Sequence, residues 1–178
     1  MCLSVYASIR LFNGEGCMRS FYTKTFLKEI ADILNDGHQT VIPVSGTSME
    51  PCLIDQKDRV KLEKLNEGTG DTTDIKKGDI LLYLRNGDQY VLHRVVYQKG
   101  LTLQMRGDNQ LVKESVPVSS VCARVIEIEH SGKWYSCDSA YFKFYSLVWN
   151  RLPILRWIRW HLIVYGKRLK SRKRTSRR

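Results

Sequence analysis

The chain has 178 residues, of which 43% are hydrophobic and 26% are charged. This composition suits one globular domain with a real core and leaves too little chain for a comfortable second domain. The formal net charge of +11 arises from 29 Lys and Arg against 18 Asp and Glu, and the excess lies in residues 151–178, which contain no acid. The body is therefore neutral, while the basic segment suits a membrane surface, an acidic partner or nucleic acid.

The N-terminal region shows no targeting signal. Residues 1–12 are largely apolar, but the stretch is short, contains Arg10 and precedes no small-residue cleavage site. We therefore expect neither a signal peptide nor a membrane span. Because residues 1–17 have no clear periodicity, we interpret them as an extension before a start at Met18.

The cysteines argue against two classes of small domain. They are odd in number and lack the paired short spacing of zinc sites or disulfide frameworks, which excludes both. Cys52, which follows Pro51, is interpreted as a small buried hydrophobe and not as a reactive thiol. Nothing in the sequence implies a metal or another cofactor.

One helix and then a series of strands are predicted along the chain. Apolar residues at helical spacing predict a helix over residues 21–36. Short β-rich runs follow at Thr40–Val44, Arg59–Leu62, Ile80–Leu84, Tyr90–Tyr97, Leu101–Arg106 and Val121–Glu129. Asn86-Gly87 favours a tight hairpin turn, and the polar residues 66–74 favour a loop. The fold is therefore predicted to be mainly β.

Four short motifs occur in order along this β region. They are Val44-Ser45-Gly46-Thr47-Ser48-Met49-Glu50-Pro51, Lys77-Gly78-Asp79-Ile80, Leu92-His93-Arg94-Val95 and Arg106-Gly107-Asp108-Asn109. Over about residues 41–129 the chain resembles the type I signal peptidases, whose nucleophile lies in a Ser-Met-x-Pro motif. The first motif also resembles the related self-cleaving SOS repressors. The resemblance implies a serine endopeptidase on their shared β-fold, with Ser48 as nucleophile.

The third motif indicates the general base. A serine hydroxyl needs a base within hydrogen-bond reach, and the strand that carries lysine in bacterial signal peptidases has none here. Arg94 stays protonated and cannot be that base; we interpret it as a structural or surface cation. The His-Arg pair resembles the endoplasmic-reticulum and archaeal type, in which histidine replaces lysine, so we expect His93 to serve.

Two acids are candidates to orient His93. Asp108 matches the Gly-Asp-Asn box of the histidine type and is preferred. Glu114 is a possible second acid, since the family's Asp-Asp pair is missing after the box. Asp79 is expected to hold a turn instead.

The oxyanion hole is predicted to use backbone N–H groups of Ser48 and Thr47. The family's additional serine, two residues before the nucleophile, is replaced by Gly46. The side chain of Ser45 or Thr47 is an open alternative.

The organisation that we expect is an extension over residues 1–20, a peptidase domain with its N-terminal helix over 21–140, and a basic aromatic tail over 141–178. The tail is predicted to form an amphipathic helix that lies on an anionic membrane through Trp149, Trp157 and Trp160. Localisation is therefore expected to be peripheral membrane or cytoplasmic.

The predicted substrate is a precursor peptide or protein with a leader or signal segment. Two rivals stay open: a self-cleaving regulator like the SOS repressors, and a non-enzymatic adaptor that binds membrane or nucleic acid. Against the first rival, the N-terminal arm of this chain contains no Ala-Gly or Cys-Gly dipeptide of the kind that SOS repressors cleave. Nucleic acid is the less favoured partner.

Overall fold

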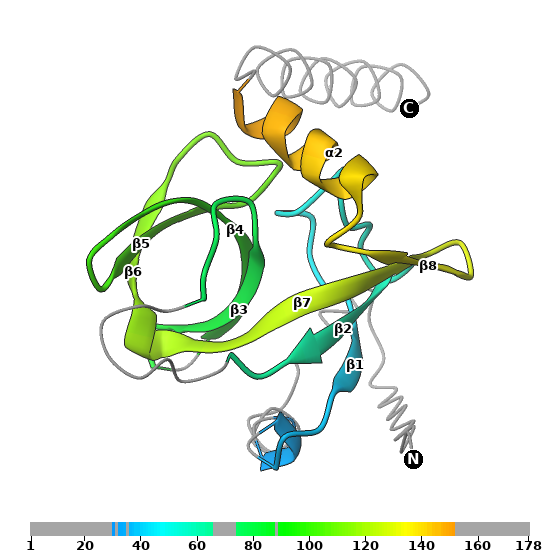
Figure 1. The fold of residues 1–178 in the computed structure, drawn as a ribbon, viewed down its shortest axis with the longest axis horizontal. Coiled ribbons are helices and arrows are strands. Elements are labelled where there is room, and N and C mark those ends of the chain that lie inside the picture. The colour runs from blue at the N-terminus through cyan, green and yellow to red at the C-terminus, as the bar shows by residue number, and fades with distance from the viewer. Residues whose placement is uncertain (1–29, 31, 35, 66–73, 88, 152–178) are drawn as a thin grey trace, which may run out of the picture.

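The computed structural model describes residues 30, 32–34, 36–65, 74–87 and 89–151 (Figure 1). Eight strands lie in these segments, and a mainly β fold is thereby confirmed. Their bounds are β1 Thr40–Pro43, β2 Arg59–Glu63, β3 Ile80–Arg85, β4 Gln89–Lys99, β5 Thr102–Arg106, β6 Glu114–Pro117, β7 Val121–His130 and β8 Lys133–Ser136. A 3-10 turn, η1, spans Val118–Ser120, and helix α2 spans Ala140–Arg151.

The strands form one antiparallel sheet in the order β1-β2-β7-β3-β4-β5-β6, with β8 also paired to β7. The long strand β7 joins two parts of this sheet, because it pairs with β2 along one half and with β3 along the other. Register shifts occur in β4 between Val95 and Tyr97 and in the β3–β7 pair between Leu82 and Tyr83. In Figure 1 the sheet curls from β3 to β6 around its own inner face.

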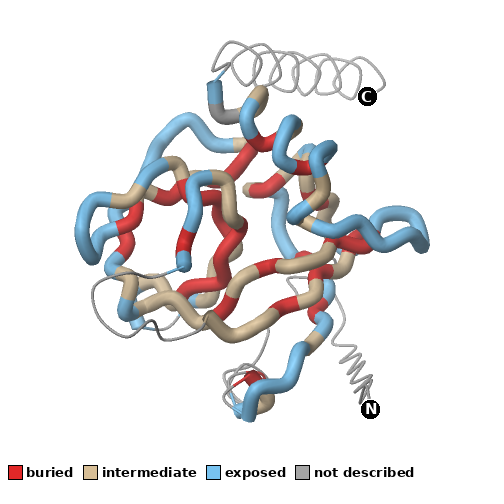
Figure 2. Tube along the Cα trace, viewed as in Figure 1, coloured by how far each residue is buried: buried red, intermediate tan, exposed pale blue. Residues whose placement is uncertain are grey.

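Two hydrophobic clusters fill the two sides of this sheet. Leu81 and Tyr83 lie with residues of β5 and β6 inside the curl. The alternate residues of β3, Ile80 and Leu82, belong to the second cluster with β1, β2, β7 and Phe142 of α2. Strand β3 is buried on both faces, and Figure 2 shows the buried residues concentrated along these central strands. The same alternation applies to β4, which pairs with β3, so consecutive residues of β4 also face different sides of the sheet.

The six predicted β-runs correspond to strands, whereas β6 and β8 were not anticipated. Asn86 and Gly87 both have positive φ, 52° and 78°, as the predicted hairpin turn between β3 and β4 requires. All four residues of β8 are exposed, so they lack the buried alternation that marks a strand in sequence. Its hairpin with β7 turns at Ser131 and Gly132, again with positive φ.

Helix α2 packs on the body through its inner side. It begins after Ser139, whose hydroxyl accepts a hydrogen bond from the N–H of Phe142 at 3.2 Å. Of the helix predicted over residues 21–36, residues 30 and 32–34 are helical with Ile30 and Leu34 buried, and residue 36 lies in a turn; the other residues lie outside the described part of the chain. Within the described segments, no helix combines the length and the apolar character needed to cross a membrane.

Candidate active site

Ser48 lies in a turn after β1 that is fixed by hydrogen bonds at its base. The N–H of Val44 donates to the carbonyl of Asp58 at 2.9 Å. The Asp55 carboxylate accepts from the N–H of Gly46 at 2.8 Å. Gly46 has a φ of 95°, a conformation that residues with a Cβ rarely adopt, so glycine suits this bend. The turn leaves Ser48 partly exposed.

His93 faces this turn from the middle of β4. It pairs with Leu81 across the β3–β4 ladder, and only 1% of its surface is exposed. Its Nε2 atom is buried and has no hydrogen-bond partner among the described residues. A Cβ atom added at Gly107 would lie 2.5 Å from the Ser48 carbonyl oxygen and 3.1 Å from this Nε2. The Ser48 carbonyl and the imidazole therefore both border Gly107, where only glycine leaves room.

Asn109 links the turn that carries Ser48 to the segment Gly107-Asp108-Asn109 after β5, which is called the Gly-Asp-Asn box below. Its N–H donates to the carbonyl of Ser48 at 2.8 Å, and its side-chain amide donates to the carbonyl of Thr47 at 3.1 Å. The N–H groups of Thr47 and Ser48 donate no hydrogen bond to any other described residue. The oxyanion hole expected from these two N–H groups stays a prediction.

Glu114, at the start of β6, binds the other nitrogen of the imidazole. Its Oε1 lies 2.5 Å from Nδ1 of His93 and also accepts a hydrogen bond from the Tyr83 hydroxyl. Arg85 donates hydrogen bonds to both carboxylate oxygens of Glu114, with Nε 2.9 Å from Oε2 and Nη2 2.7 Å from Oε1. The Tyr83 hydroxyl itself lies 3.0 Å from Nδ1. The carboxylate is therefore held in place from three sides.

This arrangement sets the ionisation of both partners. Burial lowers the pKa of His93 against the raising effect of the Glu114 carboxylate, which favours neutral imidazole. For Glu114, burial opposes ionisation, but hydrogen bonds from Arg85 and Tyr83 outweigh it and lower the pKa. A charged Glu114 accepts the Nδ1–H of a neutral His93, so Nε2 carries the lone pair.

Asp108, the preferred partner of His93 in the sequence, does not take that place. Both its oxygens bind Arg94, with Nε 2.8 Å from Oδ1 and Nη2 2.7 Å from Oδ2. His93 and Arg94 are consecutive on β4 and point to opposite faces of the sheet. Asp108 lies on the Arg94 face and Glu114 on the His93 face. The prediction that Asp108 orients His93 is corrected accordingly, and Glu114, the second choice, is the acid in contact.

Arg94 is buried, not a surface cation, and joins several segments. Besides Asp108, it donates to the carbonyl of Gly78 at 2.9 Å and to the sulfur of Cys52 at 3.2 Å. Its guanidinium also lies 5.3 Å from the centre of the Phe142 ring of α2. Cys52 belongs to the turn that carries the serine, and Asp108 to the box beside it. The Arg94–Asp108 ion pair thus holds the two segments together beneath α2.

Trp149 also belongs to this network. Its indole N–H donates to the carbonyl of Asp108 at 2.8 Å, and its ring stacks on Tyr145 with centroids 5.9 Å apart. This indole therefore packs toward the Gly-Asp-Asn box, and the membrane contact expected of Trp149 stays a prediction. Trp157 and Trp160 lie outside the described residues.

The structure bears on the secondary expectations for Asp79 and for Cys52, whose side chain is partly buried. The Asp79 carboxylate accepts from the N–H of Lys76 at 2.9 Å and so closes a turn. Burial raises the pKa of the Cys52 thiol to about 12, which makes it a poor nucleophile. Within the described segments, no group of three or more His, Cys, Asp or Glu side chains is placed to hold a metal ion.

Sequence reasoning missed Tyr83 and Arg85, which alternate on β3 and point to the same side as Glu114. Their spacing of two was a usable signal, because alternate residues of a strand share a face.

Comparison with known proteins adds no relative: no family model matches the chain, and no curated protein matches it either.

Proposed function

We propose that the chain is a serine endopeptidase of the type I signal peptidase kind, with Ser48 as nucleophile and His93 as general base. The observation that carries the proposal is the buried Nε2 of His93, which has no partner among the described residues and borders Gly107 together with the Ser48 carbonyl. A buried polar atom without a partner is costly in a merely structural role. In a peptidase, this atom receives the serine proton.

The proposed reaction begins when the Ser48 hydroxyl attacks the scissile carbonyl and transfers its proton to Nε2 of His93. The N–H groups of Thr47 and Ser48 donate to the resulting oxyanion. The C–N bond then breaks as the imidazolium returns the proton to the leaving amine, which leaves an acyl ester on Ser48. Water, deprotonated by His93, hydrolyses this ester and regenerates both side chains.

Glu114 and Arg85 have distinct parts in this scheme. The Glu114 carboxylate holds Nδ1–H and stabilises the transient imidazolium, since opposite charges in a half-buried site attract strongly. Arg85 is a positioning residue, because it binds both oxygens of Glu114 and thereby fixes the carboxylate against His93. The Arg94–Asp108 pair is assigned a structural part on the opposite face of β4.

The proposed substrates are leader or signal segments of precursor peptides. By resemblance to the family, we expect small residues such as alanine before the scissile bond. An extended segment suits this site, because a substrate strand gains backbone hydrogen bonds from a sheet edge while pockets select side chains.

A peptide library with alanine fixed at one position tests the proposal. The full chain is incubated with the library, and new termini are identified by mass spectrometry. We expect cleavage after alanine that is lost in Ser48→Ala and in His93→Ala, each by on the order of a thousandfold or more, with little further loss in the double variant. Cleavage that persists in a folded Ser48→Ala protein would rule out the serine mechanism.

A further inference from the structure

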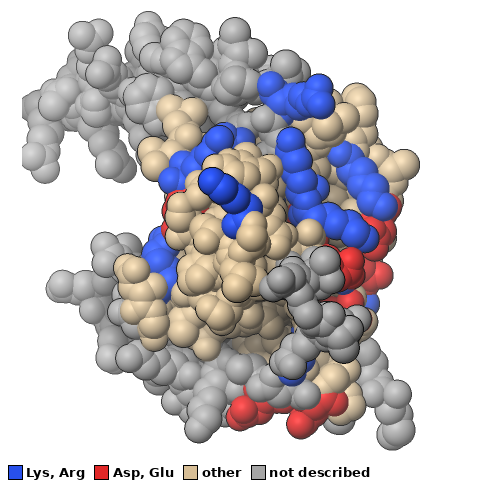
Figure 3. All heavy atoms as spheres, turned by 60° about the vertical axis from the view of Figure 1, so that its left-hand side comes forward, with Lys and Arg blue, Asp and Glu red and all other residues tan. Residues whose placement is uncertain are grey.

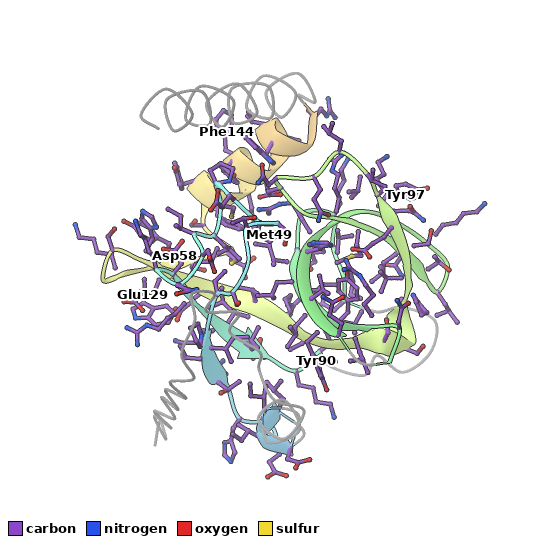
Figure 4. The ribbon with its side chains drawn as sticks, turned by 180° about the vertical axis from the view of Figure 1, so that it is seen from behind. Met49, Asp58, Tyr90, Tyr97, Glu129 and Phe144 are labelled. Carbon is purple, nitrogen blue, oxygen red and sulfur yellow. The ribbon has the colours of Figure 1, made fainter. Side chains whose placement is uncertain are left out.

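Helix α2 has two faces of opposite character. Its inner face packs against the body, where Phe142 and Ser146 are 8% and 7% exposed. Its outer face consists of Tyr141, Phe144 and Leu147, which are 73%, 66% and 50% exposed. Residues at this spacing form one stripe along a helix. Figure 4 shows Phe144 on the side of α2 that faces away from the strands. Single exposed apolar residues are ordinary, but a continuous stripe indicates a contact surface.

The charge of α2 and of the sequence beyond it is strongly positive, although Lys143 forms an ion pair with the exposed Asp138 just before the helix. Lys143 and Arg151 are exposed on α2, and the helix contains no acidic residue. The sequence beyond it, residues 152–178, adds ten Lys and Arg and no acid. In Figure 3 most of the visible Lys and Arg atoms lie in the upper half of the molecule, whereas Asp and Glu lie at its right and lower margins.

We infer that the outer face of α2 docks on the surface of an anionic lipid bilayer. Aromatic and aliphatic side chains flanked by cations match the boundary between acyl chains and acidic headgroups. A second copy of the chain fits less well, because each copy carries the same excess of positive charge, eleven Lys and Arg without an acid over residues 151–178, and like charges repel. Nucleic acid offers negative charge but no partner for the aliphatic Leu147.

Docking in this orientation has a geometric consequence for the site. The inner face of α2 contacts Arg94 through Phe142 and the Asp108 carbonyl through Trp149. The box that carries Gly107 would therefore lie about one helix diameter, roughly 10 Å, from the bilayer surface. This inference stands on the surface of α2 and does not depend on the peptidase chemistry.

Flotation with vesicles of phosphatidylcholine and phosphatidylglycerol in equal parts tests the inference on the full chain. Wild-type protein should float with the vesicles at low salt. Tyr141→Ser combined with Phe144→Ser should weaken partitioning by at least about tenfold, because two large apolar groups lose their burial in the interface. The matched control is Leu101→Ser, at a side chain that is 62% exposed in the β4–β5 turn. It should bind as the wild type does.

A charge variant provides a second measurement that leaves the apolar groups intact. Lys143→Gln with Arg151→Gln should weaken binding at low salt and reduce its dependence on salt concentration. Circular dichroism and thermal melting verify that each variant is folded.

Four outcomes would overturn the inference. Wild-type protein that stays with the unbound fraction at low salt, or a serine double variant that floats as well as wild type, excludes the outer face as the lipid contact. Equal binding to vesicles of phosphatidylcholine alone refutes the requirement for acidic lipid. A dimer in size-exclusion chromatography that dissociates in the double variant, without vesicle binding by the wild type, assigns the face to a second copy.

Discussion

Replacing Glu114 by glutamine isolates the charge that faces His93 while keeping the shape of the side chain. The carboxylate oxygen lies 2.5 Å from Nδ1 of the imidazole. At an effective dielectric constant of about 20, a full charge pair at this distance is worth roughly 6–7 kcal/mol. The Glu114 side chain is 29% exposed, so screening by water reduces this value to about 3 kcal/mol. Arg85, left without its counter-charge, would further disfavour the imidazolium.

The expected result is a loss of kcat by on the order of a hundredfold or more, with little change in KM, because the lost charge acts mainly on the transition state. Steady-state cleavage of a peptide identified from the library measures it. The matched control is Glu127→Gln, since Glu127 forms an ion pair with Lys61 on β2, away from the imidazole. If Glu114→Gln kept more than half of the wild-type kcat, Glu114 would have no part in orienting or stabilising His93.

Three further substitutions separate structural from catalytic effects. Asp108→Asn should lower the free energy of unfolding by about 3–5 kcal/mol, measured by guanidinium denaturation, because it leaves the buried Arg94 without its counter-charge. Arg85→Gln should move the acid limb of the kcat/KM profile to higher pH, since burial chiefly and the Arg85 charge additionally lower the pKa of His93, and removing that charge raises it. Gly107→Ala should abolish cleavage while the protein stays folded, because the new methyl group would lie 2.5 Å from the nucleophile's carbonyl oxygen.

Each of these predictions has a result that contradicts it. An Asp108→Asn protein as stable as wild type would show that Arg94 needs no counter-charge. For Arg85→Gln the control is Arg124→Gln, which removes an ion pair with Asp74; an acid limb that shifts equally in both, or only to lower pH, contradicts the role of Arg85. Full activity in Gly107→Ala would mean that the turn and the imidazole can move apart without consequence.

Much of the sheet was predictable because its strands combine β-branched and aromatic residues with turn signals between them. The Asn86-Gly87 pair fixed the register of β3 and β4 and so placed His93 correctly on its strand. The strands that escaped prediction, β6 and β8, are short and largely exposed. Their pairing depends on neighbours that are distant in sequence, and the period-two pattern that reveals a half-buried strand is absent from β8.

The wrong choice between the two acids has a different origin. Asp108 belongs to a motif and Glu114 does not, so local sequence favours Asp108. The alternation of side chains along β4 decides between the acids. His93 and its neighbour Arg94 lie on opposite faces of the sheet, and each needs an acid on its own side. Which acid reaches which face depends on how residues 109–113 return the chain to β6, and no local pattern encodes that path.

The position of α2 bears on when the chain can first act. Phe142 covers the Arg94–Asp108 pair, and Trp149 hydrogen-bonds to the same box, yet the serine and histidine precede this helix by many residues. During synthesis, Ser48 and His93 leave the ribosome before helix α2 has been made. A nascent chain halted before residue 149 would possess the chemistry without the fixed geometry. If the proposed function is correct, cleavage begins only after α2 has been made and has packed on the body.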